Sequence, residues 1–228
     1  MSSIFITASG TEVGKTLLAS LIVTQLKRRG RPVQALKPVV TGFDSSNAVD
    51  SDPARLLDAL GLPLDKAHLD RLSPWRFRAP LSPNMAAARE QRAIPFTELV
   101  RYCGASTARG LTVIEGIGGV MVPIDDEHTV LDWIAALGCA AVLVTGSYLG
   151  AISHTLTALR ALDSMQIAVR AIVVSESADQ PAPASETART IERFAGYTPV
   201  CVLPRLTDLA DAPDILSMLG LGDDSSPT

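Results

Sequence analysis

Residues 8–16, with the sequence ASGTEVGKT, combine the residue types that hold a phosphate chain. They lie between an apolar stretch and a pattern of helical spacing, which is the context expected for a phosphate-binding loop. Backbone N–H groups at a helix N-terminus carry partial positive charge and can hold phosphate oxygens. Gly14 permits close approach of the backbone, Lys15 can reach the β and γ phosphates, and the Thr16 hydroxyl can ligate Mg²⁺. Although Ser9 replaces the glycine of the strict motif, we predict a nucleoside triphosphate site here.

Two further charged residues lie in or directly after apolar stretches. Glu115 follows a predicted strand at 111–114, and a carboxylate at that position can anchor Mg²⁺. Lys37 lies inside an apolar stretch, where its ammonium group is costly to bury without an anionic partner such as phosphate or a carboxylated substrate. The alternatives are a turn-capping role for Glu115 and an edge-strand position from which Lys37 reaches water.

The elements that would position these residues alternate along the chain. Apolar runs predict strands at 4–7, 33–40, 111–114, 140–144, 168–174 and 200–203. Helical spacing predicts helices at 16–29, 53–60, 96–102, 130–137, 153–163 and 185–195, whereas 43–52 and 74–83 are expected to be irregular. This order indicates a single P-loop α/β domain at 1–219, with a mostly parallel sheet covered by helices on both faces, and a disordered tail at 220–228. Ligands of such sheets bind beyond the carboxyl ends of the strands.

The composition narrows the class of protein further. Among 228 residues, 47% are hydrophobic and 19% are charged, and the formal net charge is -4, so neither a nucleic-acid partner nor a membrane is expected. Cys103, Cys139 and Cys201 are widely spaced, which predicts buried free thiols rather than a metal site or a disulfide framework. The N-terminus lacks the pattern of a signal peptide, and we expect a cytoplasmic protein.

Several motifs occur together in the order and spacing of dethiobiotin synthetase, and the sequence resembles that family over nearly its whole length. They are TEVGKT at 11–16, KPVVTG at 37–42, SD at 51–52, SP at 82–83, EGIGG at 115–119 and LGAISH at 149–154. The resemblance implies a homodimeric, ATP- and Mg²⁺-dependent ligase of biotin synthesis. Such an enzyme takes 7,8-diaminononanoate, CO₂ and ATP, and forms a carbamate and then a carbamic–phosphoric anhydride before the ureido ring closes.

The resemblance also implies roles for individual residues. Lys15 and Lys37 would be catalytic, on either side of the γ-phosphate and the carbamate. Mg²⁺ would be held by Thr16, Asp52 and Glu115, with Asp50 as the alternative to Asp52. The nucleotide would be bound by Glu12, Val13, Gly14, Lys15, Thr16, Leu17, Asp52, Glu115, Gly116, Ile117, Gly118, Ser175, Glu176, Pro204, Arg205 and Leu206. The substrate would be bound by Thr41 and, across the dimer, by Leu149, Gly150, Ala151, Ile152 and Ser153.

Some positions depart from the family pattern. Ser153 stands where asparagine is common, and Ser175 stands where many relatives place the asparagine that contacts adenine, so nucleotide preference stays open. His154 has two interpretations, a catalytic base or a structural residue at the start of a helix.

Two other functions share this kind of loop. An amidating enzyme of the cobyrinate diamide synthase type usually carries a glutaminase domain with a nucleophilic cysteine, whereas Cys201 lies in an apolar strand. A ParA/MinD-like ATPase switch needs an additional lysine early in the loop, where this sequence has Ser9, Gly10 and Thr11.

Overall fold

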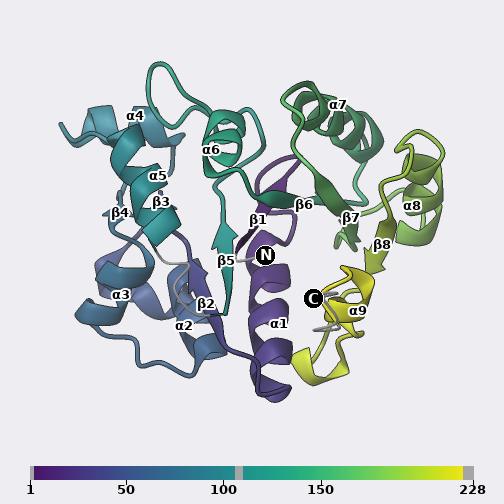
Figure 1. Cartoon of the computed structure of the whole chain (residues 1–228), viewed down its shortest axis with the longest axis horizontal. Coiled ribbons are helices and arrows are strands. Elements are labelled where there is room, and N and C mark those ends of the chain that lie inside the picture. Colours follow the sequence, from purple (N-terminus) through teal and green to yellow (C-terminus); the bar gives the residue numbers. More distant parts are fainter. Residues whose placement is uncertain (1–2, 106–109, 223–228) are drawn as a thin grey trace, which may run out of the picture.

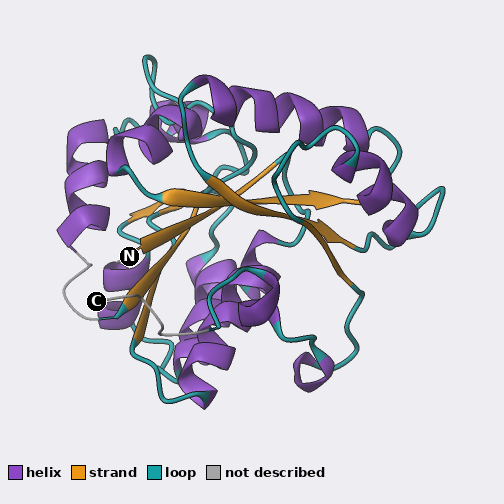
Figure 2. Ribbon diagram, turned by 45° about the vertical axis from the view of Figure 1, so that its right-hand side comes forward, coloured by secondary structure: helices purple, strands orange, loops and turns teal. Residues whose placement is uncertain are grey.

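The computed structural model describes residues 3–105 and 110–222. In this part of the chain, a six-stranded sheet has the order β2-β5-β1-β6-β7-β8, and every neighbouring pair is parallel. Its strands are β1 (Ser3–Ala8), β2 (Val33–Leu36), β5 (Leu111–Glu115), β6 (Ala140–Gly146), β7 (Val169–Ser175) and β8 (Val200–Leu203). Figure 2 shows helices on both faces of the sheet, so the predicted α/β fold class is confirmed.

The helices are short to medium in length and follow most of the strands in the sequence (Figure 1). They are α1 (Lys15–Arg28), α2 (Asp52–Leu60), α3 (Lys66–Leu72), α4 (Pro83–Arg89), α5 (Phe96–Ala105), α6 (Val130–Leu137), α7 (Ala151–Ser164), α8 (Ala184–Glu192) and α9 (Ile215–Met218). Two 3₁₀ helices, η1 (Ser45–Asp50) and η2 (Leu209–Asp211), lie between them. In the described ranges, no helix has the length and apolar character needed to cross a membrane.

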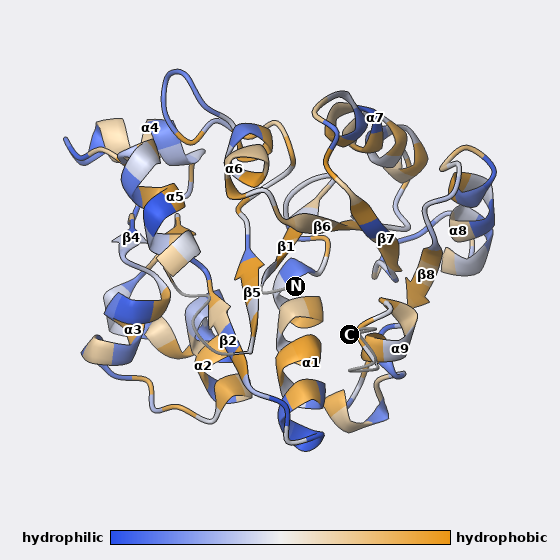
Figure 3. Ribbon diagram, viewed as in Figure 1, coloured by the Kyte–Doolittle hydropathy of each residue, from blue (hydrophilic) through white to orange (hydrophobic). Residues whose placement is uncertain are grey.

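The two faces of the sheet are packed separately because side chains alternate along each strand. On β1, the Phe5 ring packs edge-on against Trp133 of α6, with ring centroids 4.8 Å apart. Phe5 and Trp133 belong to one buried hydrophobic cluster, whereas Ile4 and Ile6 of the same strand belong to a second one, which includes the apolar side of α1. Figure 3 shows this concentration of hydrophobic residues on the strands and on α1. The two clusters fix the sheet and thereby the loops at its carboxyl edge.

The single strand predicted at 33–40 is wrong, because it is divided at Pro38. β2 ends at Leu36, and β3 (Val39–Val40) pairs instead with β4 (Trp75–Arg76) in a separate two-stranded sheet. Proline has no N–H to donate to a sheet, which favours a break at this position. The backbone N–H of Lys37 donates to Leu72 O at 3.0 Å. Lys37 therefore lies at the junction between the two sheets.

Other boundaries also differ from the predictions. The segment 43–52, expected to be irregular, contains η1 and the start of α2, and 74–83 contains β4 and the start of α4. Short helices α3 and α9 were not predicted, and α7 begins at Ala151 instead of residue 153. Cys103 is buried, as expected, but Cys139 and Cys201 are only partly buried. The predicted tail falls largely on residues 223–228, which lie outside the described residues.

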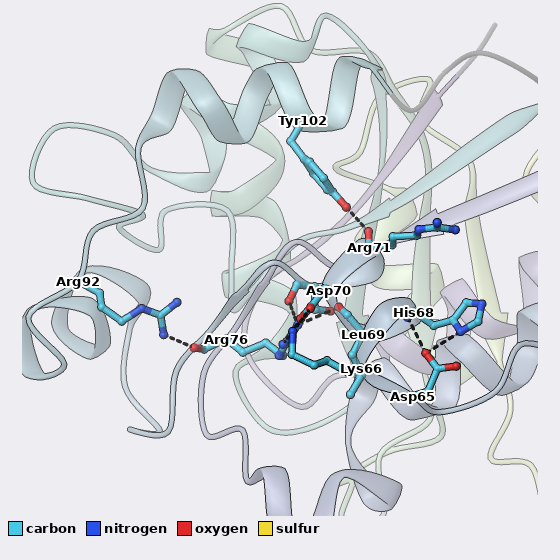
Figure 4. A network of polar contacts seen from close by, with 10 residues as sticks. Asp65, Lys66, His68, Leu69, Asp70, Arg71, Arg76, Arg92 and Tyr102 are labelled. Atoms are coloured by element: carbon cyan, nitrogen blue, oxygen red, sulfur yellow. Dashed lines mark hydrogen bonds and ion pairs between the residues drawn. The ribbon is translucent and has the colours of Figure 1, made fainter.

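An exposed polar network ties α3 to β4 (Figure 4). Asp70 accepts hydrogen bonds from Lys66 and from Arg76, both at 2.6 Å. Asp65 caps α3 by accepting from the backbone N–H of His68 at 2.9 Å, as short polar residues at N-caps do. This network holds α3 in place. The carbonyl of Leu72, the last residue of α3, accepts the hydrogen bond from the backbone N–H of Lys37.

Candidate active site

A cavity of about 490 Å³ lies at the carboxyl edge of the sheet, where β1, β2 and β5 end. It is lined by Thr11, Glu12, Gly14, Lys15, Thr16, Leu17, Lys37, Val40, Thr41, Asp50, Asp52, Arg55, Glu115, Ile117 and Gly118. The strand ends bring these segments together although they are distant in sequence, as expected for a parallel sheet. The volume falls within the range of small-molecule sites.

The loop between β1 and α1 forms one wall of this cavity. Gly14 caps α1 with a left-handed backbone (φ 98°), and a Cβ atom there would lie 2.7 Å from Ser175 Oγ, so glycine is required. The ammonium group of Lys15 donates to Gly10 O at 3.0 Å, back across the loop. A helix N-terminus capped by glycine leaves its first N–H groups without a side-chain partner, which suits an anion.

Burial and neighbouring charges set the protonation of Lys15. Burial lowers the pKa of Lys15, and the nearby ammonium of Lys37 lowers it further. Glu115 and Asp52 act in the opposite direction but do not compensate, so the pKa is about 8. Phosphate oxygens near Lys15 would raise this pKa and favour the protonated ammonium group.

A buried charge cluster forms the floor of the cavity. Lys37 and Glu115 are 3% and 1% exposed, and their side chains form an ion pair through Glu115 Oε1. The same oxygen accepts from the Thr16 hydroxyl at 2.6 Å, and Lys37 Nζ lies 3.1 Å from Asp52 Oδ2. Burial opposes the charge on Lys37, but Glu115 and Asp52 outweigh it and raise its pKa. Burial likewise opposes ionisation of Asp52, but Lys37 outweighs it and lowers that pKa.

One atom of this cluster is unsatisfied. Among the described residues, Glu115 Oε2 is buried and has no hydrogen-bond partner. A buried carboxylate oxygen without a partner is costly, and such atoms commonly mark the place of an ion or water. The oxygen atoms of this cluster, from the hydroxyl of Thr16 and the carboxylates of Asp52 and Glu115, are the hard ligands that Mg²⁺ prefers. Within 3–105 and 110–222, no group of three or more His, Cys, Asp or Glu side chains could hold a metal ion.

The structure brings together most, but not all, of the predicted site residues. Eleven predicted positions line the cavity, and Asp50, the alternative metal ligand, lines it together with Asp52. Val13 and Gly116 lie beside it; Val13 is buried, and Gly116 packs so closely on Phe5 that a Cβ would lie 2.7 Å from the ring. The other predicted residues gather in two places outside the cavity.

The first of these places is at the ends of β7 and β8. Ser175 pairs in register with Leu203, and its hydroxyl packs against Gly14 of the phosphate loop. The Glu176 carboxylate accepts from the backbone N–H of Arg205 at 3.0 Å, a hydrogen bond that lowers the pKa of Glu176. Ser175, Glu176 and the segment 204–206 thus form one group on the β7 side of the loop.

The second place is the start of α7. Leu149 is 85% exposed, Gly150 caps the helix with φ 99°, and Ala151 is fully buried. His154 Nδ1 lies 2.9 Å from the Tyr148 hydroxyl. This segment, 149–153, does not line the cavity of its own chain.

Sequence reasoning missed three residues that line the cavity: Thr11, Val40 and Arg55. Thr11 and Val40 lie within motifs that were recognised but assigned to other positions. Arg55 lies in the predicted helix 53–60, but Asp52 was assigned to the preceding irregular segment; because α2 begins at Asp52, the two residues are three apart and share a helix face.

The fold and the phosphate loop define a P-loop nucleotide-binding protein, and comparison with known proteins agrees. Residues 2–213 match a family model described as an AAA domain. A chain of the MinC:MinD cell division protein complex of Aquifex aeolicus has a TM-score of 0.54 at 12% identity, covering 92% of this chain and 84% of that one. The signal recognition particle receptor FtsY of Elizabethkingia anophelis has a TM-score of 0.50 at 13% identity, covering 96% and 64%. These likenesses show the fold alone.

Relatives of higher identity specify the family. A protein of Acidiphilium cryptum is 45% identical over 94% of this chain and 95% of its own length. One of Caulobacter sp. strain K31 is 46% identical over 90% and 89%, and one of Bacillus subtilis strain 168 is 31% identical over 92% and 90%. Each is named ATP-dependent dethiobiotin synthetase BioD. The chain therefore belongs to the dethiobiotin synthetase family, whose members are ATP-dependent ligases.

Proposed function

We propose that this chain converts 7,8-diaminononanoate, CO₂ and ATP into dethiobiotin, ADP and phosphate. Family membership supports the identity of the reaction. The observation that carries the proposal for this chain is the buried Lys37, which lies beside Glu115 and Asp52 in the same cavity as the phosphate-loop residue Lys15. Two cations at one cavity suit a reaction in which one anion attacks another.

The proposed chemistry has three steps. One amine of the substrate adds to CO₂ and loses a proton, which gives a carbamate. A carbamate oxygen then attacks the γ-phosphorus, and the bond to the leaving oxygen of ADP breaks. The second amine attacks the carbamoyl carbon, expels inorganic phosphate and loses a proton as the ring closes. Catalysis of the second step needs alignment and charge stabilisation more than covalent participation.

The residues divide this work between them. Lys15, on the loop, holds the β and γ phosphates, while Lys37 holds the carbamate against the γ-phosphate. Thr41, which follows β3 and lines the cavity, hydrogen-bonds the amine or carbamate. Thr16, Asp52 and Glu115 would hold Mg²⁺, and Asp50 is the alternative to Asp52. When bound, the metal supplies positive charge to the triphosphate. The unsatisfied Glu115 Oε2 supports this assignment.

The two groups outside the cavity complete the proposal. Ser175, Glu176 and 204–206 contact the base, on the β7 side of the loop that binds the phosphates. Residues 149–153 of a second copy bind the carboxylate tail of the substrate, which makes the active enzyme a homodimer. The exposure of Leu149 fits a residue that meets another molecule.

The experiment is a turnover assay with diaminononanoate, bicarbonate and each nucleoside triphosphate, in which phosphate release and product mass are measured together. We expect phosphate release only when diaminononanoate is present, in equal amount to dethiobiotin. Release that is independent of diaminononanoate would indicate an ATPase and would contradict the proposed function, while the phosphate loop would stand.

A further inference from the structure

The cations that line the cavity differ in how much positive charge they can offer a ligand. In the described residues they are Lys15, Lys37 and Arg55. Lys37 is already paired with Glu115 and Asp52. Lys15 already donates to the backbone carbonyl of Gly10, 3.0 Å away. Arg55 remains, and its guanidinium group keeps its proton.

Arg55 is also unpaired. Nowhere in 3–105 or 110–222 does a carboxylate or carbonyl lie within hydrogen-bond or ion-pair distance of its side chain. Its charge is felt by Asp52, whose pKa it helps to lower, after the larger effects of burial and Lys37. Arg76 makes a useful contrast, because its guanidinium is occupied by Asp70 and by backbone carbonyls. Arg55 is thus a permanent cation with its hydrogen-bond donors free.

The position of Arg55 is fixed by the first turns of α2, which lies beside β2 (Figure 1). The hydroxyl of Ser51 accepts from the backbone N–H of Ala54 at 3.3 Å, and Ser51 O accepts from that of Arg55 at 3.2 Å. The next two residues, Leu56 and Leu57, are 0% and 1% exposed and anchor the helix in the core. A side chain on such an anchored element can hold a reacting group at low entropic cost.

The acidic residues around it show why a free cation matters. Glu12, Asp50, Asp52 and Glu115 all line the cavity. The proposed reaction brings an anionic carbamate to an anionic γ-phosphate among these carboxylates. Negative charge on the transferred phosphoryl group is stabilised best by donors that are already in place, and planar guanidinium groups match phosphoryl oxygens in pairs.

We propose that Arg55 donates hydrogen bonds to the phosphoryl group while that group moves from the nucleotide to the carbamate oxygen. Arg55 keeps its proton and forms no covalent bond; its guanidinium neutralises charge on the phosphoryl oxygens as the bond to ADP breaks. This inference rests on the proposed function for the identity of the acceptor, but contact with the phosphoryl group can be tested without it.

The first test compares Arg55→Gln and Arg55→Lys with a matched control, Arg101→Gln, which changes an exposed arginine of α5 outside the cavity. At saturating ATP and Mg²⁺, Arg55→Gln is expected to lower kcat on the order of 10²-fold. Arg55→Lys should recover part of this loss, since it restores charge without the planar geometry. Binding of a non-hydrolysable ATP analogue, the melting temperature and the Arg101→Gln variant should all stay close to wild type.

A kcat for Arg55→Gln within about threefold of wild type would overturn the inference. So would a loss that disappears at higher Mg²⁺, because Arg55 would then act only through Asp52 and the metal. A fall in melting temperature large enough to account for the loss would equally overturn it.

The second test needs no turnover. Wild-type protein should bind ADP with aluminium fluoride, a mimic of the transferred phosphoryl group, more tightly than ADP alone, and Arg55→Gln should remove most of that gain while ADP binding is unchanged. Equal gains in both proteins would overturn the inference. Loss of the gain in a protein that is inactive on diaminononanoate would support Arg55 and reject the proposed function.

Discussion

The buried cluster in the cavity and the exposed network on α3 are built from the same groups but differ in environment. Lys66 and Asp70 form an ion pair with side chains 89% and 43% exposed, whereas the side chains of the Lys37–Glu115 ion pair are 4% and 1% exposed. Exposed pairs are solvated and screened and contribute little. Buried pairs are costly to form and strongly affected when one partner is removed. Burial therefore distinguishes the ion pair in the cavity from the one on α3.

The largest expected effect comes from removing the ammonium group of the buried cluster. Lys37→Ala should lower turnover by at least on the order of 10²-fold, because a preorganised positive charge is lost. Nucleotide binding should be retained, since the phosphate loop is intact. Steady-state kinetics and calorimetric titration with an ATP analogue measure the two effects, with Lys66→Ala as the exposed control. Unchanged turnover in Lys37→Ala would refute its role and remove the distinction between the two regions.

The carboxylate of the cluster should be the next most sensitive. Glu115→Gln keeps the shape and the Thr16 contact but removes the charge that faces Lys37 and the proposed metal. We expect activity to require much more Mg²⁺, with a comparatively small change in folding. A Mg²⁺ titration of activity beside a thermal melt separates these outcomes. If Gln merely lowers the melting temperature, Glu115 belongs with the structural ion pairs.

The lowered pKa of Lys15 predicts a pH dependence in the alkaline range. Its folded-state pKa is lowered from 10.5 to about 8, so between these values the unfolded chain binds more protons. The free energy of unfolding of the ligand-free protein should therefore rise with pH across this window as far as Lys15 determines it. Nucleotide phosphates favour protonated Lys15, so affinity should fall as pH rises above about 8. Calorimetry in buffers of different ionisation enthalpy should detect proton uptake on binding; its absence would contradict the assignment.

The smallest effect is expected in the exposed network. Asp70→Ala removes the partner of both Lys66 and Arg76, yet these contacts are open to solvent. Lys66 and then Arg76 lower the pKa of Asp70, so its contribution to stability should be lost as pH falls through that pKa. We expect a small fall in melting temperature and no change in kcat. A marked loss of activity would mean that α3 positions Lys37 through Leu72 O more tightly than the exposed contacts suggest.

Much of the site could be predicted because strand ends of a parallel sheet converge. Lys15, Thr16 and Glu115 are each placed by a strand or helix boundary that is visible in the apolar pattern. The division at Pro38 could not be predicted from apolar periodicity, because β3 takes its partner from β4, far along the chain. The short helices α3 and α4 depend on capping and tertiary contacts more than on their own pattern. The packing of Ser175 beside Gly14 depends on three-dimensional proximity, which the spacing of residues in the sequence does not supply.

The separation in sequence between the partners of Lys37 has a consequence for how the molecule assembles. The phosphate loop is formed by neighbouring residues of β1 and α1, but Lys37 meets Glu115 across 78 residues. Closing so long a stretch of chain costs conformational entropy before any contact repays it, and such contacts tend to form late in folding. An incompletely folded molecule can therefore contain the phosphate loop before Lys37 pairs with Glu115. Hydrogen exchange during refolding would show whether the N–H groups of β5, the strand that carries Glu115, are protected after those of α1.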